Sequence, residues 1–91
     1  MKGTFEEYLR KINLSENTIE SYLWTVDFYH SHYDSISKEN LLAYKGYLIE
    51  NFKPKTVNLR IQAMNRYLDF LGKEKLKLKA IKIQQKNFLE N

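Results

Sequence analysis

Hydrophobic residues recur at helical spacing along most of this chain, and the longest such run lies between Lys53 and Gly72. Apolar side chains three or four residues apart form one stripe there, as on the buried side of a helix. Pro54 suits the first position of a helix, and Gly72 suits the position just past its end. We therefore predict one amphipathic helix over this stretch. Its stripe comprises Val57, Ile61, Met64, Leu68 and Leu71.

Three shorter helices are predicted before this one, because each apolar run follows a residue whose hydroxyl can cap a helix N-terminus. Thr4 also forms a capping box with Glu7. Helices of this length with short connections predict a compact, bundle-like all-α domain of four helices. The capping residues are Thr4, Ser15 and Ser37, and the helices cover about residues 5–12, 16–32 and 38–51.

The second and third predicted helices each carry an unusual feature. Trp24 and Phe28, four residues apart, lie away from the main apolar stripe of the second helix. We expect them to pack on the first helix, and an exposed site for a partner is the alternative. Gly46 weakens the third helix by up to about 1 kcal/mol relative to alanine. We expect this glycine to permit close packing against a neighbouring helix.

The pattern changes after Gly72. Leucines and lysines alternate over residues 76–79, which indicates an extended strand or strap. A single strand has no partner within this chain, so we expect it to lie on a neighbouring chain or domain, or to cross an anionic surface. From Ala80 onward a short helix is an alternative. We divide the chain into a four-helix domain, residues 1–72, and a basic extended C-terminal linker, residues 73–91.

Length and composition fit one globular domain, with 91 residues of which 43% are hydrophobic and 29% charged. The absence of cysteine excludes a disulfide framework and a thiolate metal site, and it fits a reducing cytoplasm. The N-terminus lacks the apolar run of a signal peptide. No segment approaches the roughly 18 apolar residues that a membrane-spanning helix needs. We therefore expect a cytoplasmic protein with no membrane partner.

The net charge of +4 is distributed unevenly along the chain. Residues 1–50 hold five Lys/Arg and eight Asp/Glu, a net −3, whereas residues 51–91 hold ten and three, a net +7. A half that basic indicates an anionic partner. The aromatic content of 14% and the amides among the charges favour nucleic acid over a membrane surface. A soluble domain whose lysines serve solubility is the alternative.

The sequence offers no catalytic constellation. The two histidines of His30-Ser31-His32 diverge on a helix, because a helical metal pair needs a spacing of four residues rather than two. The chain holds only three glycines, so it has no glycine-rich phosphate loop. Glu6-Glu7 fits a solvated helix start rather than an acid–base pair. We expect no catalytic residue, no metal and no cofactor, so that the chain by itself is not an enzyme.

The second and fourth predicted helices begin alike. Residues 14–19 (LSENTI) parallel residues 52–57 (FKPKTV), with Thr18 aligned to Thr56. Backbone N–H groups and hydroxyls at helix starts bind phosphate, so the two starts could face one nucleic-acid backbone. Starts of this kind are also common in ordinary helical proteins.

The order of these segments resembles a known family. The most telling pieces are LSENTIESY at residues 14–22 and TVNLRIQAM at residues 56–64. They are similar to the N-terminal, SAM-like core-binding domain of tyrosine recombinases, the integrases of phages and conjugative transposons. The resemblance covers nearly the whole chain. The closing IKIQQKNFLEN is similar to the linker that leads into the catalytic domain of such an enzyme.

The resemblance implies a role in DNA integration and recombination by a mobile element. In this family the domain forms one half of a C-shaped clamp on double-stranded DNA, and its second and fourth helices face the major groove. The catalytic domain, which holds the tyrosine nucleophile, forms the other half and would lie beyond this chain. Other integrase protomers would be partners of the full-length enzyme, and the isolated domain would be monomeric or weakly dimeric. The implied contacts are Asn17, Thr18 and Ser21 on the second helix and Lys55, Thr56, Asn58, Arg60 and Gln62 on the fourth.

Lysines supply the remaining expected DNA contacts. Lys53 replaces the usual serine or threonine cap and could donate to a phosphate instead. The amides and the arginine of the fourth helix could read base edges, since amides pair with adenine and arginine with guanine. For Arg60 the alternative is an ion pair with a carboxylate of the second helix, Glu20 or Asp27. The predicted phosphate-binding lysines are Lys53, Lys55, Lys77, Lys79 and Lys82.

The main alternative function is a helical module for protein–protein interaction. SAM-like domains can self-associate, and the aromatic second helix together with the unpaired extended segment at residues 76–83 could bind another protomer. The basic surface would then be incidental, without direct DNA contact.

Overall fold

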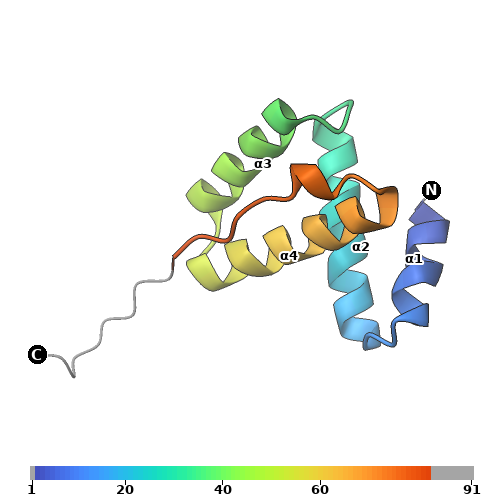
Figure 1. The fold of residues 1–91 in the computed structure, drawn as a ribbon. Coiled ribbons are helices and arrows are strands. Elements are labelled where there is room, and N and C mark those ends of the chain that lie inside the picture. Colours follow the sequence, from blue (N-terminus) through green and yellow to red (C-terminus); the bar gives the residue numbers. More distant parts are fainter. Residues whose placement is uncertain (1, 83–91) are drawn as a thin grey trace, which may run out of the picture.

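The computed structural model describes residues 2–82, which form four α-helices and one short 3-10 helix joined by loops and followed by an extended segment. The elements are α1 (Lys2–Lys11), α2 (Glu16–His32), α3 (Lys38–Asn51), α4 (Pro54–Leu71) and the 3-10 helix η1 (Glu74–Leu76). α4 packs against each of the other three helices (Figure 1). This arrangement confirms the prediction of a compact all-α domain with four helices.

The predicted cap residues start α2 and α3. Ser15 Oγ and Ser37 Oγ each accept a hydrogen bond from the backbone N–H three residues later, at 3.2 and 3.1 Å. Gly72 follows α4 in the left-handed conformation (φ 74°), which glycine adopts without strain. α1 begins two residues before Thr4, so the prediction that Thr4 caps this helix is wrong.

α4 supplies the centre of the hydrophobic core. Most of its predicted stripe is confirmed, since only Leu71 is less than fully buried. Burying one large aliphatic side chain contributes about 1.5–3 kcal/mol, so this stripe holds the other helices in place. The buried residues that face it are Phe5 and Leu9 on α1, Ile19, Tyr22, Val26 and Tyr29 on α2, and Leu41, Tyr44 and Leu48 on α3.

The second apolar side of α2 faces α3 rather than α1. Phe28 stacks on Tyr44 and Tyr47, with ring centroids 5.7 and 5.2 Å apart. Trp24 is 45% exposed. α1 instead packs its Phe5 ring against the aromatic rings of α4. The prediction that Trp24 and Phe28 pack on the first helix is therefore wrong, and the alternative of exposure holds for Trp24.

Tyr44 ties α3 to α2 at the centre of this aromatic cluster. Its side chain is fully buried, and its hydroxyl donates to the Thr25 carbonyl oxygen at 3.0 Å. Burial disfavours the charged phenolate and raises the pKa of Tyr44 well above its ordinary value of 10. The folded state therefore keeps a proton that the unfolded state releases at a lower pH.

This tyrosine should make the domain sensitive to alkali. Stability is fully present below about pH 10 and should fall above it, by up to about 1.4 kcal/mol per pH unit for this group. Urea unfolding of the wild type and of Tyr44→Phe on both sides of that pH measures the effect. The variant should be less stable at neutral pH but should lose less stability in alkali. If the wild type and Tyr44→Phe lost the same free energy of unfolding at high pH, Tyr44 would not be the cause of the alkali sensitivity.

Gly46 lies on an exposed part of α3, where an added Cβ atom would meet no heavy atom within 4 Å. The expectation that this glycine permits close helix packing is therefore wrong. Gly46→Ala should raise the free energy of unfolding by about 0.5–1 kcal/mol, because alanine loses less backbone entropy in a helix. Urea unfolding measures the change. Ala43→Gly, at another exposed position of α3, is the matched control and should lower stability by a similar amount.

The chain turns back between α4 and η1, and residues 77–82, here called the strap, then run along α4 beside α3 (Figure 1). Asn65 forms two hydrogen bonds with the backbone of Leu78, at 2.7 and 2.9 Å, and Asn58 forms two with the backbone of Ile81, at 2.8 and 3.0 Å. In each pair the amide oxygen accepts from the backbone N–H and the amide nitrogen donates to the carbonyl oxygen. Each asparagine therefore does for one strap residue what a neighbouring β-strand would do.

The strap corrects one prediction about the linker. The expectation that an extended segment has no partner within this chain is wrong, because two side-chain amides satisfy its backbone and Leu78 is buried against the core. Among the described residues no β-strand forms. Lys77 Nζ also lies 2.8 Å from the Asp69 carboxylate. The part of the linker prediction that concerns residues 83–91, including the short helix, lies outside the described residues.

Candidate nucleic-acid interface

A shallow hollow of about 580 Å³ lies between the first half of α2 and α4. Asn17, Glu20, Ser21 and Trp24 line it from α2, because residues three and four apart share one face of a helix. Arg60 lines it from α4. The structure thus brings together three of the predicted DNA contacts, Asn17, Ser21 and Arg60. Trp24 was not among them, and its spacing of seven residues from Asn17 is the signal that could have placed it there.

Arg60 is held in place by α2. Its Nη1 donates to Ser21 Oγ at 2.9 Å and to Thr25 Oγ1 at 3.1 Å. Its guanidinium lies over the Trp24 ring, 4.5 Å from the ring centroid, and 6.0 Å from that of Phe52. Among the residues that the structure describes, Arg60 has no carboxylate partner, so the alternative of an ion pair with the second helix is not what positions it. This arginine joins α2 to α4 instead.

The start of α4 carries backbone donors without partners. Lys53 occupies the N-cap and offers no acceptor, so no side chain caps the helix. Pro54 has no N–H, and the N–H groups of Lys55 and Thr56 form no hydrogen bond within residues 2–82. Helix starts carry a partial positive charge, to which the exposed ammonium groups of Lys53 and Lys55 add. This end of α4 is suited to an anion.

The start of α2 differs, although its sequence is parallel. Ser15 Oγ accepts from the Thr18 N–H, and the Ser15 hydroxyl donates to Thr18 Oγ1 at 3.0 Å. Thr18 is therefore engaged in capping its own helix, whereas Thr56 has no equivalent partner in the part of the chain that the structure describes. The likeness of the two segments in sequence does not extend to their hydrogen bonding.

An exposed basic ridge continues from the start of α4. Lys55, Leu59, Gln62 and Arg66 follow one another at intervals of four, three and four residues and so share one face. Lys55 and Gln62 are exposed, Leu59 is 43% exposed, and Arg66 is half-buried. None of the four forms a side-chain hydrogen bond or an ion pair with another described residue. Arg66 was not predicted as a contact, but its place on this face could have been read from the helical spacing.

Asn58 and the strap lysines are partly engaged elsewhere. Both ends of the Asn58 amide are bound to Ile81, so this side chain cannot read a base edge while the strap is docked. Lys77 pairs with Asp69. Lys79 and Lys82 are exposed on the strap. The predicted contacts therefore fall on separate parts of the surface rather than on one.

Acidic residues limit where an anion can bind on α2. Glu16, at the start of this helix, is bound by Arg10 of α1, which lowers the pKa of Glu16 and offsets its charge. Glu20 lines the hollow and has no cationic partner among the side chains of residues 5–82. Phosphate is therefore better accommodated at the start of α4 and along the ridge than inside the hollow.

The histidines of α2 are engaged within the chain. His30 Nε2 lies 2.9 Å from the Tyr67 hydroxyl, and His32 Nδ1 lies 3.0 Å from the Phe28 carbonyl oxygen. Within residues 2–82 no group of three or more His, Cys, Asp or Glu side chains is placed to hold a metal ion. The same residues include no helix with the length and apolar character needed to cross a bilayer.

Comparison with known proteins gives no relative on which to base a function. No family model matches the chain, and neither curated proteins nor solved structures include a significant match. The resemblance to tyrosine recombinases therefore rests on the sequence segments described above.

Proposed function

We propose that this chain is a DNA-binding domain of the kind that tyrosine recombinases use to clamp one half-site of duplex DNA. The observation that carries the proposal is the start of α4, where free backbone N–H groups and two lysines lie at one end of a basic ridge. DNA phosphates would satisfy these donors and neutralise the charges together. The resemblance in sequence supplies the class of DNA-binding protein.

The contacts of the domain divide into three roles in this proposal. Lys53, Lys55 and Arg66 bind phosphates, and the exposed amide of Gln62 reads a base edge. Arg60 acts as a positioning residue, since its hydrogen bonds and its stacking on Trp24 hold α2 against α4. Strand cleavage and joining belong to a catalytic domain outside this chain, and further integrase protomers complete the assembly.

Binding of a mixed-sequence duplex should fall steeply with salt, with log K changing by about −0.9 per neutralised phosphate against log salt. Lys55→Ala should weaken binding to all sequences alike and reduce this slope by about one phosphate. Fluorescence anisotropy over a salt series measures both. The matched control is Lys11→Ala, which removes an exposed lysine at the C-terminal end of α1. The proposal would be overturned if the affinity for duplex DNA did not change with salt, or if Lys55→Ala and Lys11→Ala lost the same affinity.

Base reading is tested separately. Selection of bound sequences from a randomised duplex pool should show that Gln62→Ala relaxes preference at one position, by about 1–3 kcal/mol. Lys55→Ala should leave the preferred sequence unchanged. If Gln62→Ala leaves the preference intact, this face of α4 does not lie in the major groove.

Self-association is the second candidate function, and the exposed Trp24 favours it. A ring 45% exposed on a small domain is a common anchor at protein interfaces. Amide shifts on titration with DNA separate the two functions. Shifts at Lys55 and Thr56 support DNA binding. Unchanged amide shifts at Lys55 and Thr56, together with shifts around Trp24 that depend on protein concentration, support self-association.

A further inference from the structure

We propose that a groove between α3 and the strap binds an acidic peptide segment that carries a large apolar side chain. Only lysines and leucines line this groove, which has a volume of about 250 Å³. One wall is formed by Lys38, Leu41, Leu42 and Lys45 of α3, and the other by residues 75–79 of η1 and the strap. The inference rests on residues other than those at the start of α4 that carry the proposed function.

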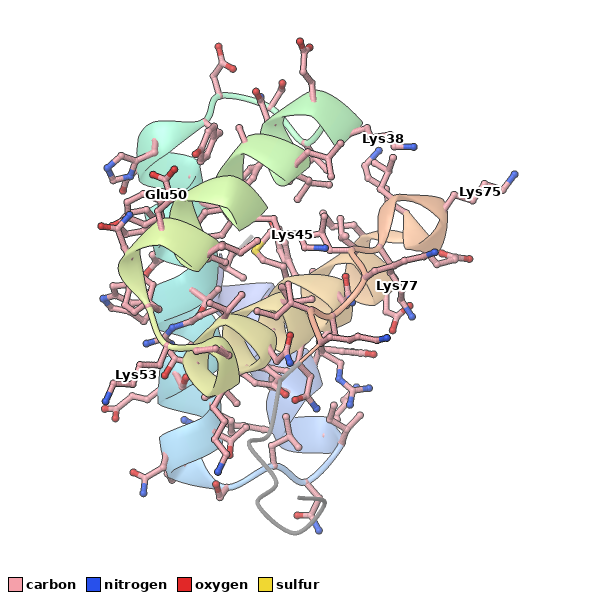
Figure 2. All side chains as sticks on the ribbon, turned by 90° about the vertical axis from the view of Figure 1, so that its left-hand side faces the viewer. Lys38, Lys45, Glu50, Lys53, Lys75 and Lys77 are labelled. Carbon is pink, nitrogen blue, oxygen red and sulfur yellow. The ribbon has the colours of Figure 1, made fainter. Side chains whose placement is uncertain are left out.

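The rim of the groove is strongly cationic. No acidic residue lines it. Figure 2 shows Lys38 and Lys45 on α3 across from Lys75 and Lys77, whereas Glu50 lies on the far side of α3. Lys45 Nζ donates to the Lys79 carbonyl oxygen at 2.7 Å, so this ammonium joins the two walls.

Several of these charges lack a counter-ion among the residues that the structure describes. Lys77 pairs with Asp69 at 2.8 Å. Lys38, Lys75 and Lys79 have no acidic partner among the described residues. Like charges gathered around one groove repel one another, and carboxylates of a bound segment would relieve this repulsion.

The leucines on the floor of the groove indicate that the ligand also has an apolar side chain. Leu42 is 51% exposed there, and Leu76 is half-buried beside the buried Leu41 and Leu78. A DNA backbone offers these leucines only the small C–H groups of its sugars between charged phosphates, whereas a leucine or phenylalanine of a peptide would cover them. The volume lies below the about 300–1,000 Å³ of typical small-molecule sites, which favours a single apolar side chain over a cofactor-sized ligand. An apolar anchor between acidic residues matches both the rim and the floor.

The strap wall depends on Asn65. This asparagine holds Leu78 through two hydrogen bonds, and Leu78 belongs to the segment that forms the wall. Docking of the strap therefore creates the groove. Substitution of Asn65 should weaken peptide binding even though Asn65 itself does not line the groove.

A fluorescent synthetic peptide with two adjacent leucines between two runs of glutamate tests the proposal on the intact chain. Anisotropy should show saturable binding. The double variant Lys38→Glu/Lys75→Glu should weaken it about tenfold or more, because two attractive charges become repulsive. Leu42→Ser should weaken it about fivefold through loss of apolar contact. A peptide with serines in place of the leucines should bind as weakly to the wild type as the leucine peptide binds to Leu42→Ser.

Two matched variants and a competitor decide the outcome. Lys11→Glu and Leu59→Ser change an exposed lysine and an exposed leucine outside the groove, and both should bind the leucine peptide like the wild type. Unlabelled duplex DNA tests the other anionic partner. The proposal is overturned if Leu42→Ser binds the leucine peptide as the wild type does, or if the serine peptide binds as well as the leucine peptide. It is also overturned if duplex DNA displaces the peptide and the double lysine variant loses affinity for peptide and duplex equally. Loss of duplex binding in Lys55→Ala with peptide binding intact shows that the two sites are separate.

Discussion

Arg60→Ala should lower the free energy of unfolding by about 2–4 kcal/mol, the largest effect expected from any single polar side chain of the domain. The variant loses hydrogen bonds to two hydroxyls of α2 and the contact of the guanidinium with Trp24. It also leaves the Ser21 and Thr25 hydroxyls without their partner on α4. Urea unfolding followed by circular dichroism measures the loss.

Two further substitutions define the cause of this loss. Arg60→Lys should recover little of the stability, because one ammonium cannot reproduce the planar fork that bonds and stacks at the same time. Arg66→Ala removes an arginine of the same helix that has no ion-pair partner among residues 2–82, and it should change stability by less than about 0.5 kcal/mol. Equal effects at positions 60 and 66 would show that Arg60 does not join α2 to α4. A change in DNA sequence preference after Arg60→Ala would reflect displaced helices rather than a lost base contact.

Asn65→Ala should release the strap and lower stability by about 1–3 kcal/mol, since the Leu78 N–H and C=O lose their partners together. The loss should be local. Amide hydrogen exchange at Leu78 and Ile81 should approach the rate of an unprotected chain, while the core of α4 remains protected. Asn58→Ala should act in the same way but most strongly at Ile81.

An isosteric change separates the two hydrogen bonds of this asparagine. Asn65→Asp keeps an acceptor for the Leu78 N–H and removes the donor to its carbonyl oxygen, so it should lie between the wild type and the alanine variant. Gln62→Ala removes an exposed amide of α4 that has no partner among the described residues, and it should leave exchange at Leu78 unchanged. Uniform loss of protection across the domain would contradict a local role for the asparagine.

Except for the start of α1, the helices and their limits could be predicted from sequence because their signals are local. Ser15 and Ser37 cap helices as expected, Gly72 takes the left-handed conformation at the end of α4, and the period of the apolar stripe identifies the buried face of α4. The position of Trp24 and Phe28 could not be predicted in this way. A second apolar side shows that a helix has another neighbour, but the sequence does not say which one.

The candidate interface was predicted only in outline. The basic second half of the chain and the missing cap at Lys53 are visible in the sequence and mark the start of α4. Asn58 and Arg60 were predicted as base contacts because a polar residue outside the apolar stripe has the same pattern whether it faces solvent or another segment. Their partners, Ile81 and Ser21, lie 23 and 39 residues away, beyond the reach of any local pattern.

The spacing of the two asparagines along α4 matches the length of the strap between the residues that they hold. Asn58 and Asn65 are seven helical residues apart, a rise of about 10.5 Å. The strap residues that they hold, Leu78 and Ile81, are three extended residues apart, which spans about 10 Å. Two turns of helix and three steps of extended chain therefore match in length. One residue inserted between Leu78 and Ile81 would add about 3.3 Å to the strap and nothing to the helix, so only one of the two asparagines could keep its pair of hydrogen bonds.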